Sequence, residues 1–245
     1  MEYYYKLPVD YEIDYRSEMV KFCLWEKINL SGTSTVSINY IRGRCGYSGD
    51  NRNKNSFSCY VRNILKDLIQ ANQIIQVYGE DVSTATSTSY LEFEIFDSFY
   101  EIQTKAYAKL TASVFNALMS IDCNLSKTVL LETYAYMRSH IIENSQQTYG
   151  FCSGLDKTIV RELGLNRKTV DTCLNAFVEG GLFIKHTTGS YYANGSPKNA
   201  PNIYVLPDEN AQPNIQALLE QMKQRYKVDE FAETLIPNIK NKNKK

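Results

Sequence analysis

The fold is decided by the stretch Asp156-Lys-Thr-Ile-Val-Arg-Glu-Leu-Gly-Leu-Asn-Arg-Lys-Thr-Val-Asp-Thr-Cys-Leu174. Its apolar residues recur at helical spacing on both sides of Gly164. Glycine suits a sharp turn there because it adopts backbone conformations that other residues avoid. Asp156 and Asn166 are placed to cap the helices that follow them. The stretch therefore predicts a short helix to Leu163, a tight turn, and a second helix from Arg167 to Glu179.

This arrangement is a helix-turn-helix, and its second helix has one apolar face and one polar face. Val170, Cys173, Leu174 and Phe177 fall on the inward face. The candidate DNA contacts on the other face are Arg167, Lys168, Thr169, Thr172 and Asn175. Asp171 lies on the same face, where a carboxylate near phosphates is unfavourable unless it accepts from a cytosine amine or pairs with Lys168. Short polar side chains on such a helix reach base edges in the major groove, and Lys and Arg hold phosphates. The pattern predicts sequence-specific contact with double-stranded DNA.

A related segment lies 109 positions earlier in the chain. Val61–Val77 aligns with Val170–His186, and apolar residues coincide at 61/170, 64/173, 65/174, 68/177, 69/178, 74/183 and 75/184. A fixed period indicates two copies of one structural unit. Each copy is predicted to contain a helix that ends in a short polar turn and is followed by a strand. The first copy's strands are expected at 74–78 and 90–96, and those of the second at 182–186 and 203–206.

The first copy has its own candidate DNA surface. Ile41, Cys45 and Gly46 fall on Ile159, Leu163 and Gly164 with an offset of 118, so about nine residues are inserted in the first turn. The candidate contacts here are Arg42, Arg44, Arg52, Lys54, Ser56, Arg62, Asn63 and Lys66. This basic region is followed by residues 80–101, which contain acidic residues and no basic ones. Whether the hairpin at 74–96 contacts DNA therefore stays open.

The layout resembles the winged-helix proteins of Gram-positive phages and plasmids, including tandem winged-helix replication initiators. The resemblance covers roughly residues 17–206 and is most specific at 158–170, 180–185 and 201–206. It implies an α+β fold with two winged-helix domains in tandem. It also implies a DNA-binding protein that acts in replication initiation or transcription regulation on a mobile element. Lys198, in the long loop before the last strand, completes the candidate DNA contacts.

The expected domains are 1–102, with an acidic, extended lead-in, and 103–208, with a connecting helix at about 104–120. Residues 209–245 form an amphipathic helix and a basic tail. The helix has an apolar stripe of Ile215, Leu218, Leu219, Met222 and Tyr226. Such a stripe needs a partner. Two alternatives are open: the stripe packs on its own domain, or Ile215, Leu218, Leu219 and Met222 form a homodimer contact.

Composition narrows the function classes. The formal net charge is zero, which argues against a protein that coats nucleic acid non-specifically. Six cysteines without a C-x-x-C pair, and two histidines without ligand spacing, indicate free thiols and no metal site. We expect no catalytic residues, no enzymatic activity and no cofactor. Without an apolar leader after Met1, and without an apolar run of membrane length, a cytoplasmic protein with no membrane contact is expected.

A second function class remains. Winged helices also serve as protein-binding modules, and the neutral charge favours a winged-helix protein-interaction scaffold with little DNA contact. Four cations count against this alternative, because they lie on the outward faces of the helices that precede the two hairpins: Arg62, Lys66, Arg167 and Lys168.

Overall fold

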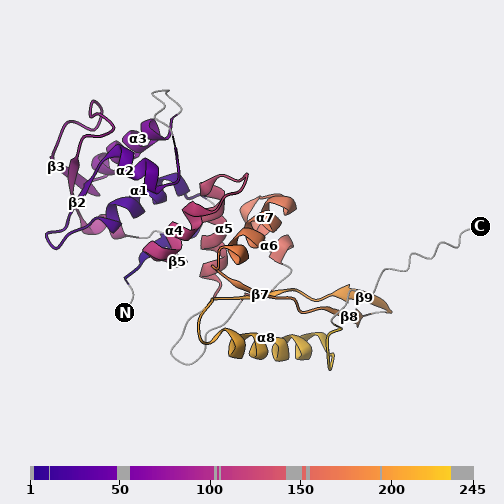
Figure 1. The fold of residues 1–245 in the computed structure, drawn as a ribbon. Helices are drawn as coiled ribbons and strands as arrows, with labels where there is room; N and C mark the ends of the chain where they lie inside the picture. The colour runs from indigo at the N-terminus through magenta and orange to yellow at the C-terminus, as the bar shows by residue number, and fades with distance from the viewer. Residues whose placement is uncertain are drawn as a thin grey trace, which may run out of the picture. The chain divides into compact units, whose positions relative to one another are not determined.

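A computed structural model describes residues 3–10, 12–48, 56–101, 104, 106–141, 151–152, 155–193 and 195–232. At 151–152 and 155–158 it describes the backbone only. By its internal contacts the chain divides into two units, Met1–Ser139 and His140–Lys245, and each is described by itself (Figure 1). Both units mix helices with small antiparallel sheets, so the fold is α+β. The division follows Ser139, whereas the sequence predicts a boundary after residue 102.

The first unit begins with a strand and ends with a helix. In chain order it contains β1 (Tyr5–Pro8), α1 (Tyr15–Glu26), β2 (Thr33–Val36), α2 (Ile38–Arg44), α3 (Phe57–Gln70), β3 (Ile74–Tyr78), β4 (Leu91–Ile95), the 3-10 helix η1 (Asp97–Tyr100), β5 (Tyr107–Leu110), α4 (Ala112–Ser120) and α5 (Lys127–Ser139). Its helices begin at polar caps. Asp14, Ser37 and Ser56 accept hydrogen bonds from backbone N–H groups of α1, α2 and α3.

The core of this unit lies between α1, α3 and the sheet β2-β4-β3. β4 is the central strand and pairs antiparallel with both neighbours. Phe93 on β4 and Leu65 on α3 are fully buried. On the other side of α1, the Phe22 ring stacks on Phe115 of α4 with centroids 4.1 Å apart. Because α1 has buried apolar side chains on both sides, it connects α4 with the core that lies against the sheet.

One expectation for this unit needs correction at its start, and another becomes more specific. The predicted connecting helix at 104–120 is instead the strand β5 followed by α4, which begins at the cap Thr111. β5 pairs antiparallel with β1, so the lead-in is part of the fold, and Tyr5 and Leu7 on β1 are buried. This pairing and the contacts of α5 with α1 and β5 explain why the first unit extends to Ser139.

The second unit is built around a three-stranded sheet. It contains β6 (Phe151–Cys152), α6 (Leu155–Leu163), α7 (Arg167–Glu179), β7 (Ile184–His186), β8 (Ser190–Ala193), β9 (Ser196–Asn199), β10 (Ile203–Val205) and α8 (Ala211–Tyr226). The strand order is β6-β10-β7, with both pairs antiparallel. The loop expected at 187–202 contains a hairpin of β8 and β9.

Each unit contains a run of elements in the same order. A strand, two helices and a second strand are followed by a closing strand that lies between the other two: β2-α2-α3-β3-β4 and β6-α6-α7-β7-β10. The ends of α3 and α7 match in detail, since Asn72 and Gly181 both have positive φ (53° and 69°) at an offset of 109. The next N–H donates across the helix end in each case, from Gln73 to Leu68 and from Leu182 to Phe177.

The apolar stripe of α8 packs on its own unit, which is the first of the two alternatives. Ile215, Leu218 and Met222 are buried in a cluster with Ile203 and Val205 of β10, and Leu219 and Tyr226 pack against it. Figure 1 shows α8 lying along the ribbon that β7 begins. The residues proposed for a homodimer contact are therefore already covered within one chain.

Replacing Leu218 with Ala should lower the free energy of unfolding by about 2–4 kcal/mol, because it opens a cavity under α8. Gln216→Ala, at an exposed position of the same helix, is the control and should change it by less than about 0.5 kcal/mol. Chemical denaturation measures both effects, and sedimentation should give one mass for all three proteins. A changed mass for the Leu218 variant would indicate instead that the stripe forms a contact between two chains.

Candidate nucleic-acid interface

The outward face of α7 is the surface that the sequence predicts best. Val170, Cys173, Leu174 and Phe177 are buried. The opposite face carries Arg167, Lys168, Asp171 and Asn175, all exposed, with Thr169 and Thr172 half-buried. Asn166 caps the helix, accepting from the Thr169 N–H at 2.9 Å. Five of the predicted contacts, Arg167, Lys168, Thr169, Thr172 and Asn175, therefore come from one helix and lie on or beside one face.

The residues on this face of α7 differ in the contacts that they already make within the helix. The Arg167 Nε lies 3.8 Å from a carboxylate oxygen of Asp171, one turn along the helix. The arginine of this exposed pair offsets part of the Asp171 charge, so the carboxylate is paired with Arg167 rather than with Lys168. The Thr172 hydroxyl donates to the Lys168 carbonyl at 2.8 Å, so its proton is used within the helix. Asn175 therefore offers the more available amide donor and acceptor for a base edge.

The β7–β10 ribbon extends beyond the sheet and is held at its base. The Ala200 N–H donates to the Gly189 carbonyl at 2.9 Å, and the Thr188 hydroxyl donates to the Pro201 carbonyl at 2.6 Å. These bonds connect the sheet to the hairpin of β8 and β9, which turns at Gly195, where φ is +72°.

The hairpin is fixed by the segment after α8. Tyr191 of β8 packs against Tyr226 and Phe231, with ring centroids 4.7 and 6.2 Å apart. Ser190 and Ala232 exchange two backbone hydrogen bonds. Lys198 pairs across the hairpin with Tyr191 and is exposed, as a phosphate contact requires.

Two further exposed residues on this ribbon were missed from the sequence. Lys185 lies on β7, and Tyr192, with 60% of its surface exposed, lies on β8. Gly189 and Gly195 indicate turns, but the residues Ser190–Ala193 between them show no apolar alternation that would predict a strand. Together with Lys198, they give the ribbon two ammonium groups and an aromatic ring.

Arg44 does not face outward as predicted. Its Nε and Nη2 donate to the two carboxylate oxygens of Glu26 at 2.7 and 2.6 Å, and the Arg44 side chain is 13% exposed. It also donates to Asn116, and its guanidinium lies over the rings of Phe22 and Phe115. The bonds from Arg44 are the main reason that the pKa of Glu26 is lowered. Arg44 therefore stabilises the first unit and is left out of the interface.

Replacing Arg44 with Ala should lower the free energy of unfolding by about 2 kcal/mol or more, because the half-buried Glu26 carboxylate loses two charge-assisted bonds and keeps the neutral Tyr40 hydroxyl as a donor. The loss should be greatest near neutral pH. A lowered pKa in the folded state means that Glu26 contributes stability above its unfolded pKa, and that this contribution disappears as the pH falls through the folded value.

Arg161→Ala is the control for Arg44→Ala. Arg161 pairs with Glu162 at 2.7 Å, but its side chain is 75% exposed, so the change should cost less than about 0.5 kcal/mol. Denaturation at pH 7 and at pH 3 measures both. Equal losses for the two variants at pH 7 would contradict the inward role of Arg44.

The other basic candidates of the first unit are only partly available. Arg62 donates to the Ala85 carbonyl at 3.0 Å and so joins α3 to the β3–β4 loop. Lys66 is half-buried near Asp81, whose pKa is lowered first by bonds from Ser83 and further by the Lys66 charge.

The remaining predicted contacts of this unit differ in their surroundings. Ser56 caps α3, Asn63 is exposed, and Arg42 is half-buried on α2. Arg52 and Lys54 lie outside the described residues. The basic cluster read from the sequence is thus not brought together as one open surface by the residues that the structure describes.

The outer face of the β2-β4-β3 sheet has a different character. Ile75 and Val77 on the edge strand β3 are 46% and 49% exposed. Ile75 pairs with Glu94 and Tyr78 with Glu92 of β4, so apolar and acidic side chains share this face. Such a face repels phosphates.

Within the described part of the chain, no group of three or more His, Cys, Asp or Glu residues is arranged to hold a metal ion. Among the same residues, no helix is both long enough and apolar enough to cross a membrane. No protein-family model matches the chain, and comparisons with curated proteins and with solved structures likewise find no match.

Proposed function

We propose that this chain is a sequence-specific binder of double-stranded DNA, built from two winged-helix domains in tandem. In this proposal α2–α3 and α6–α7 are the helix-turn-helix pairs, and the hairpins that follow are the wings. The shared element order, the shared strand order and the matching ends of α3 and α7 support it. The process served is replication initiation or transcription regulation on a mobile element, and no enzymatic activity is proposed.

One observation carries the proposal: the exposed polar face of α7 begins with two cations at the helix N-terminus. Arg167 and Lys168 are placed for phosphates, where the helix dipole also favours an anion. Asn175 lies two turns further along and is placed for a base edge. Lys198, exposed on the second wing, would supply a further phosphate contact outside the recognition helix.

The reading role is assigned to α7 rather than α3. The α6–α7 turn, Gly164–Asn166, is short, and Gly164 adopts a positive φ of 64°. The corresponding turn in the first unit is longer and carries Arg52 and Lys54, and two basic side chains beside it, Arg44 and Arg62, hold their own unit together.

Equilibrium binding to random and to specific duplexes over a range of salt concentrations tests the proposal. If the proposal holds, log K falls linearly with log salt, and the slope gives the number of phosphate contacts. A specific site should bind at least about 1,000-fold more tightly than random duplex. Binding that is absent at low salt would refute it.

The second candidate is a protein-interaction scaffold, and the acidic, apolar outer face of the first sheet favours it for that unit. Ile75, Val77 and Glu94 offer a surface for a basic, apolar partner. Ile75→Ser should weaken such an interaction, because it removes an exposed apolar contact without adding charge, and should leave DNA affinity unchanged, which separates the two functions.

A further inference from the structure

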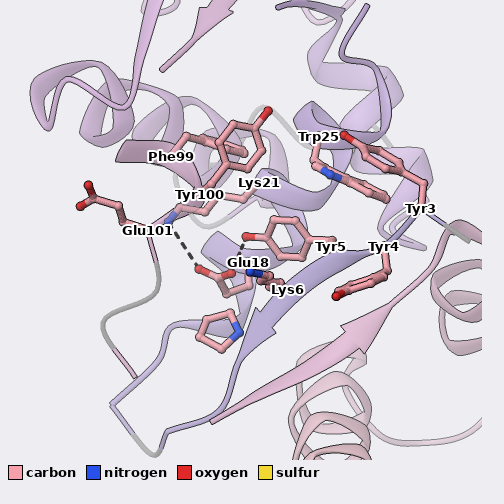
Figure 2. Close-up of a pocket in the computed structure, with 11 residues that line it drawn as sticks. Tyr3, Tyr4, Tyr5, Lys6, Glu18, Lys21, Trp25, Phe99, Tyr100 and Glu101 are labelled. Carbon is pink, nitrogen blue, oxygen red and sulfur yellow. Dashed lines mark hydrogen bonds and ion pairs between the residues drawn. The ribbon is translucent and has the colours of Figure 1, made fainter. Parts of the chain in front are cut away.

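The first unit contains a cavity of about 310 Å³ between β1, α1 and η1 (Figure 2). This volume is at the lower end of the roughly 300–1,000 Å³ of small-molecule sites. No part of the DNA-binding proposal uses it. The residues that line it are distant in the sequence from α7 and the second wing.

Aromatic rings form most of the cavity walls. Tyr3 stacks on Trp25 with centroids 4.6 Å apart and an interplanar angle of 11°. Tyr5 meets the Trp25 ring edge-on at 5.9 Å. Phe99 and Tyr100 of η1 form the opposite wall in Figure 2, also edge-on to each other. Trp25 and Phe99 are buried, whereas Tyr3 and Tyr100 are 69% and 43% exposed and lie at the rim.

A carboxylate reaches into this aromatic site. Glu18 of α1 is 6% exposed, and one of its oxygens accepts from the Tyr5 hydroxyl at 2.7 Å. The other oxygen lies 3.6 Å from the Lys21 ammonium, which is longer than the 2.7–2.9 Å of a charge-assisted hydrogen bond. That oxygen keeps capacity for another positive group. Burial raises the pKa of Glu18, so the carboxylate gains from any cation that approaches it.

The charges around the cavity favour a cation over an anion. The Lys21 ammonium already lies 5.9 Å from the Phe99 centroid, which shows that this position accepts one. The Lys6 ammonium lies instead over the Tyr107 ring. Asp14 acts on Glu18 from the start of α1, and Glu101 adds an exposed carboxylate at the mouth.

The type of cation follows from the donors that the walls could satisfy. A primary ammonium has three N–H donors, which ring faces satisfy poorly, and the Lys21 ammonium accordingly makes only a long approach of 3.6 Å to Glu18. A quaternary ammonium has no N–H donor, and its charge is stabilised by aromatic faces and a nearby carboxylate. We propose that this cavity binds an alkylated ammonium group, tertiary or quaternary, which displaces the Lys21 ammonium from Glu18.

Trp25 reports on the cavity directly, since it is the single tryptophan of the 245-residue chain. The full-length protein is titrated with tetramethylammonium chloride at pH 8 and constant ionic strength, and Trp25 fluorescence is recorded. A saturable change is expected. A neutral, water-soluble compound of similar shape, neopentyl alcohol, should bind at least about tenfold more weakly, because it lacks the charge.

Two variants test the carboxylate and the resident ammonium separately. Glu18→Gln should weaken tetramethylammonium binding by about tenfold or more, whereas the exposed Glu12→Gln should leave it unchanged. Lys21→Met should tighten binding several-fold, because the incoming cation no longer competes with the lysine. A ligand attracted to Lys21 as an anion would show the reverse.

Circular dichroism checks that each variant folds. If Glu18→Gln does not fold, Tyr100→Ala at the rim replaces it and should weaken binding about three-fold or more.

Free trimethyl-lysine and a trimethyl-lysine peptide then distinguish the source of the ligand. Equal affinity indicates a small molecule, and tighter binding of the peptide indicates a modified polypeptide. A neutral compound that binds as tightly as the cation, no saturable change, or weaker binding by Lys21→Met would overturn the proposal.

Discussion

Reversing both charges at the start of α7, with Arg167→Glu and Lys168→Glu in one protein, should weaken duplex DNA binding by on the order of 100-fold near physiological salt. Both side chains are exposed on the proposed recognition helix. The double variant loses two phosphate contacts and adds repulsion, so the slope of log K against log salt should also fall by about 2.

The fold should survive this change. Glutamate in the first turn of a helix interacts favourably with the helix dipole, which offsets the loss of the exposed Arg167–Asp171 pair. Arg225→Glu with Lys227→Glu is the matched control, because it makes the same change in net charge at exposed positions at the end of α8. Equal losses of affinity in the two double variants would mean that only net charge matters and that α7 has no special role.

Replacing Phe177 with Ala should lower the free energy of unfolding by about 3–5 kcal/mol. Phe177 is fully buried on the inward face of α7, and its ring lies 6.1 Å from that of Phe183. The loss combines the transfer of the ring from the core with the cavity left behind. Because α7 would lose the support that orients it, DNA binding should fall as well.

The exposed Glu179→Ala, at the end of the same helix, is the control for Phe177→Ala and should change stability by less than about 0.5 kcal/mol. Denaturant titration followed by circular dichroism measures both variants. If the Phe177 variant lost less than about 1 kcal/mol, the packing of α7 described above would be wrong.

Local signals explain which elements could be predicted. The caps Ser56 and Asn166 and the apolar spacing behind them predicted α3 and α7 to within a residue. The repeat also predicted that both helices end in a short polar turn, and in the structure Asn72 and Gly181 adopt a left-handed conformation at equivalent positions of these turns. Caps, turns and helical periodicity are written in neighbouring residues and need no knowledge of the rest of the fold.

Long-range pairing explains the errors. The four residues of β5 show only a brief alternation before the cap Thr111, and their partner is β1, about a hundred positions away. The direction of Arg44 depends in the same way on Glu26, which no local pattern connects with it. The aromatic cavity was not predicted at all, because β1, α1 and η1 each supply only part of it.

The most direct test of the central claim is selection from a pool of randomised duplex DNA with the wild-type protein and with Asn175→Ala. Each base contact is worth about 1–3 kcal/mol of discrimination. The wild type should therefore enrich a defined motif. The variant should lose preference at one or two base pairs of that motif, while its affinity for random duplex stays nearly unchanged, since Asn175 holds no phosphate. Enrichment of the same motif by both proteins, or of no motif by the wild type, would contradict the account of α7 as the helix that reads DNA.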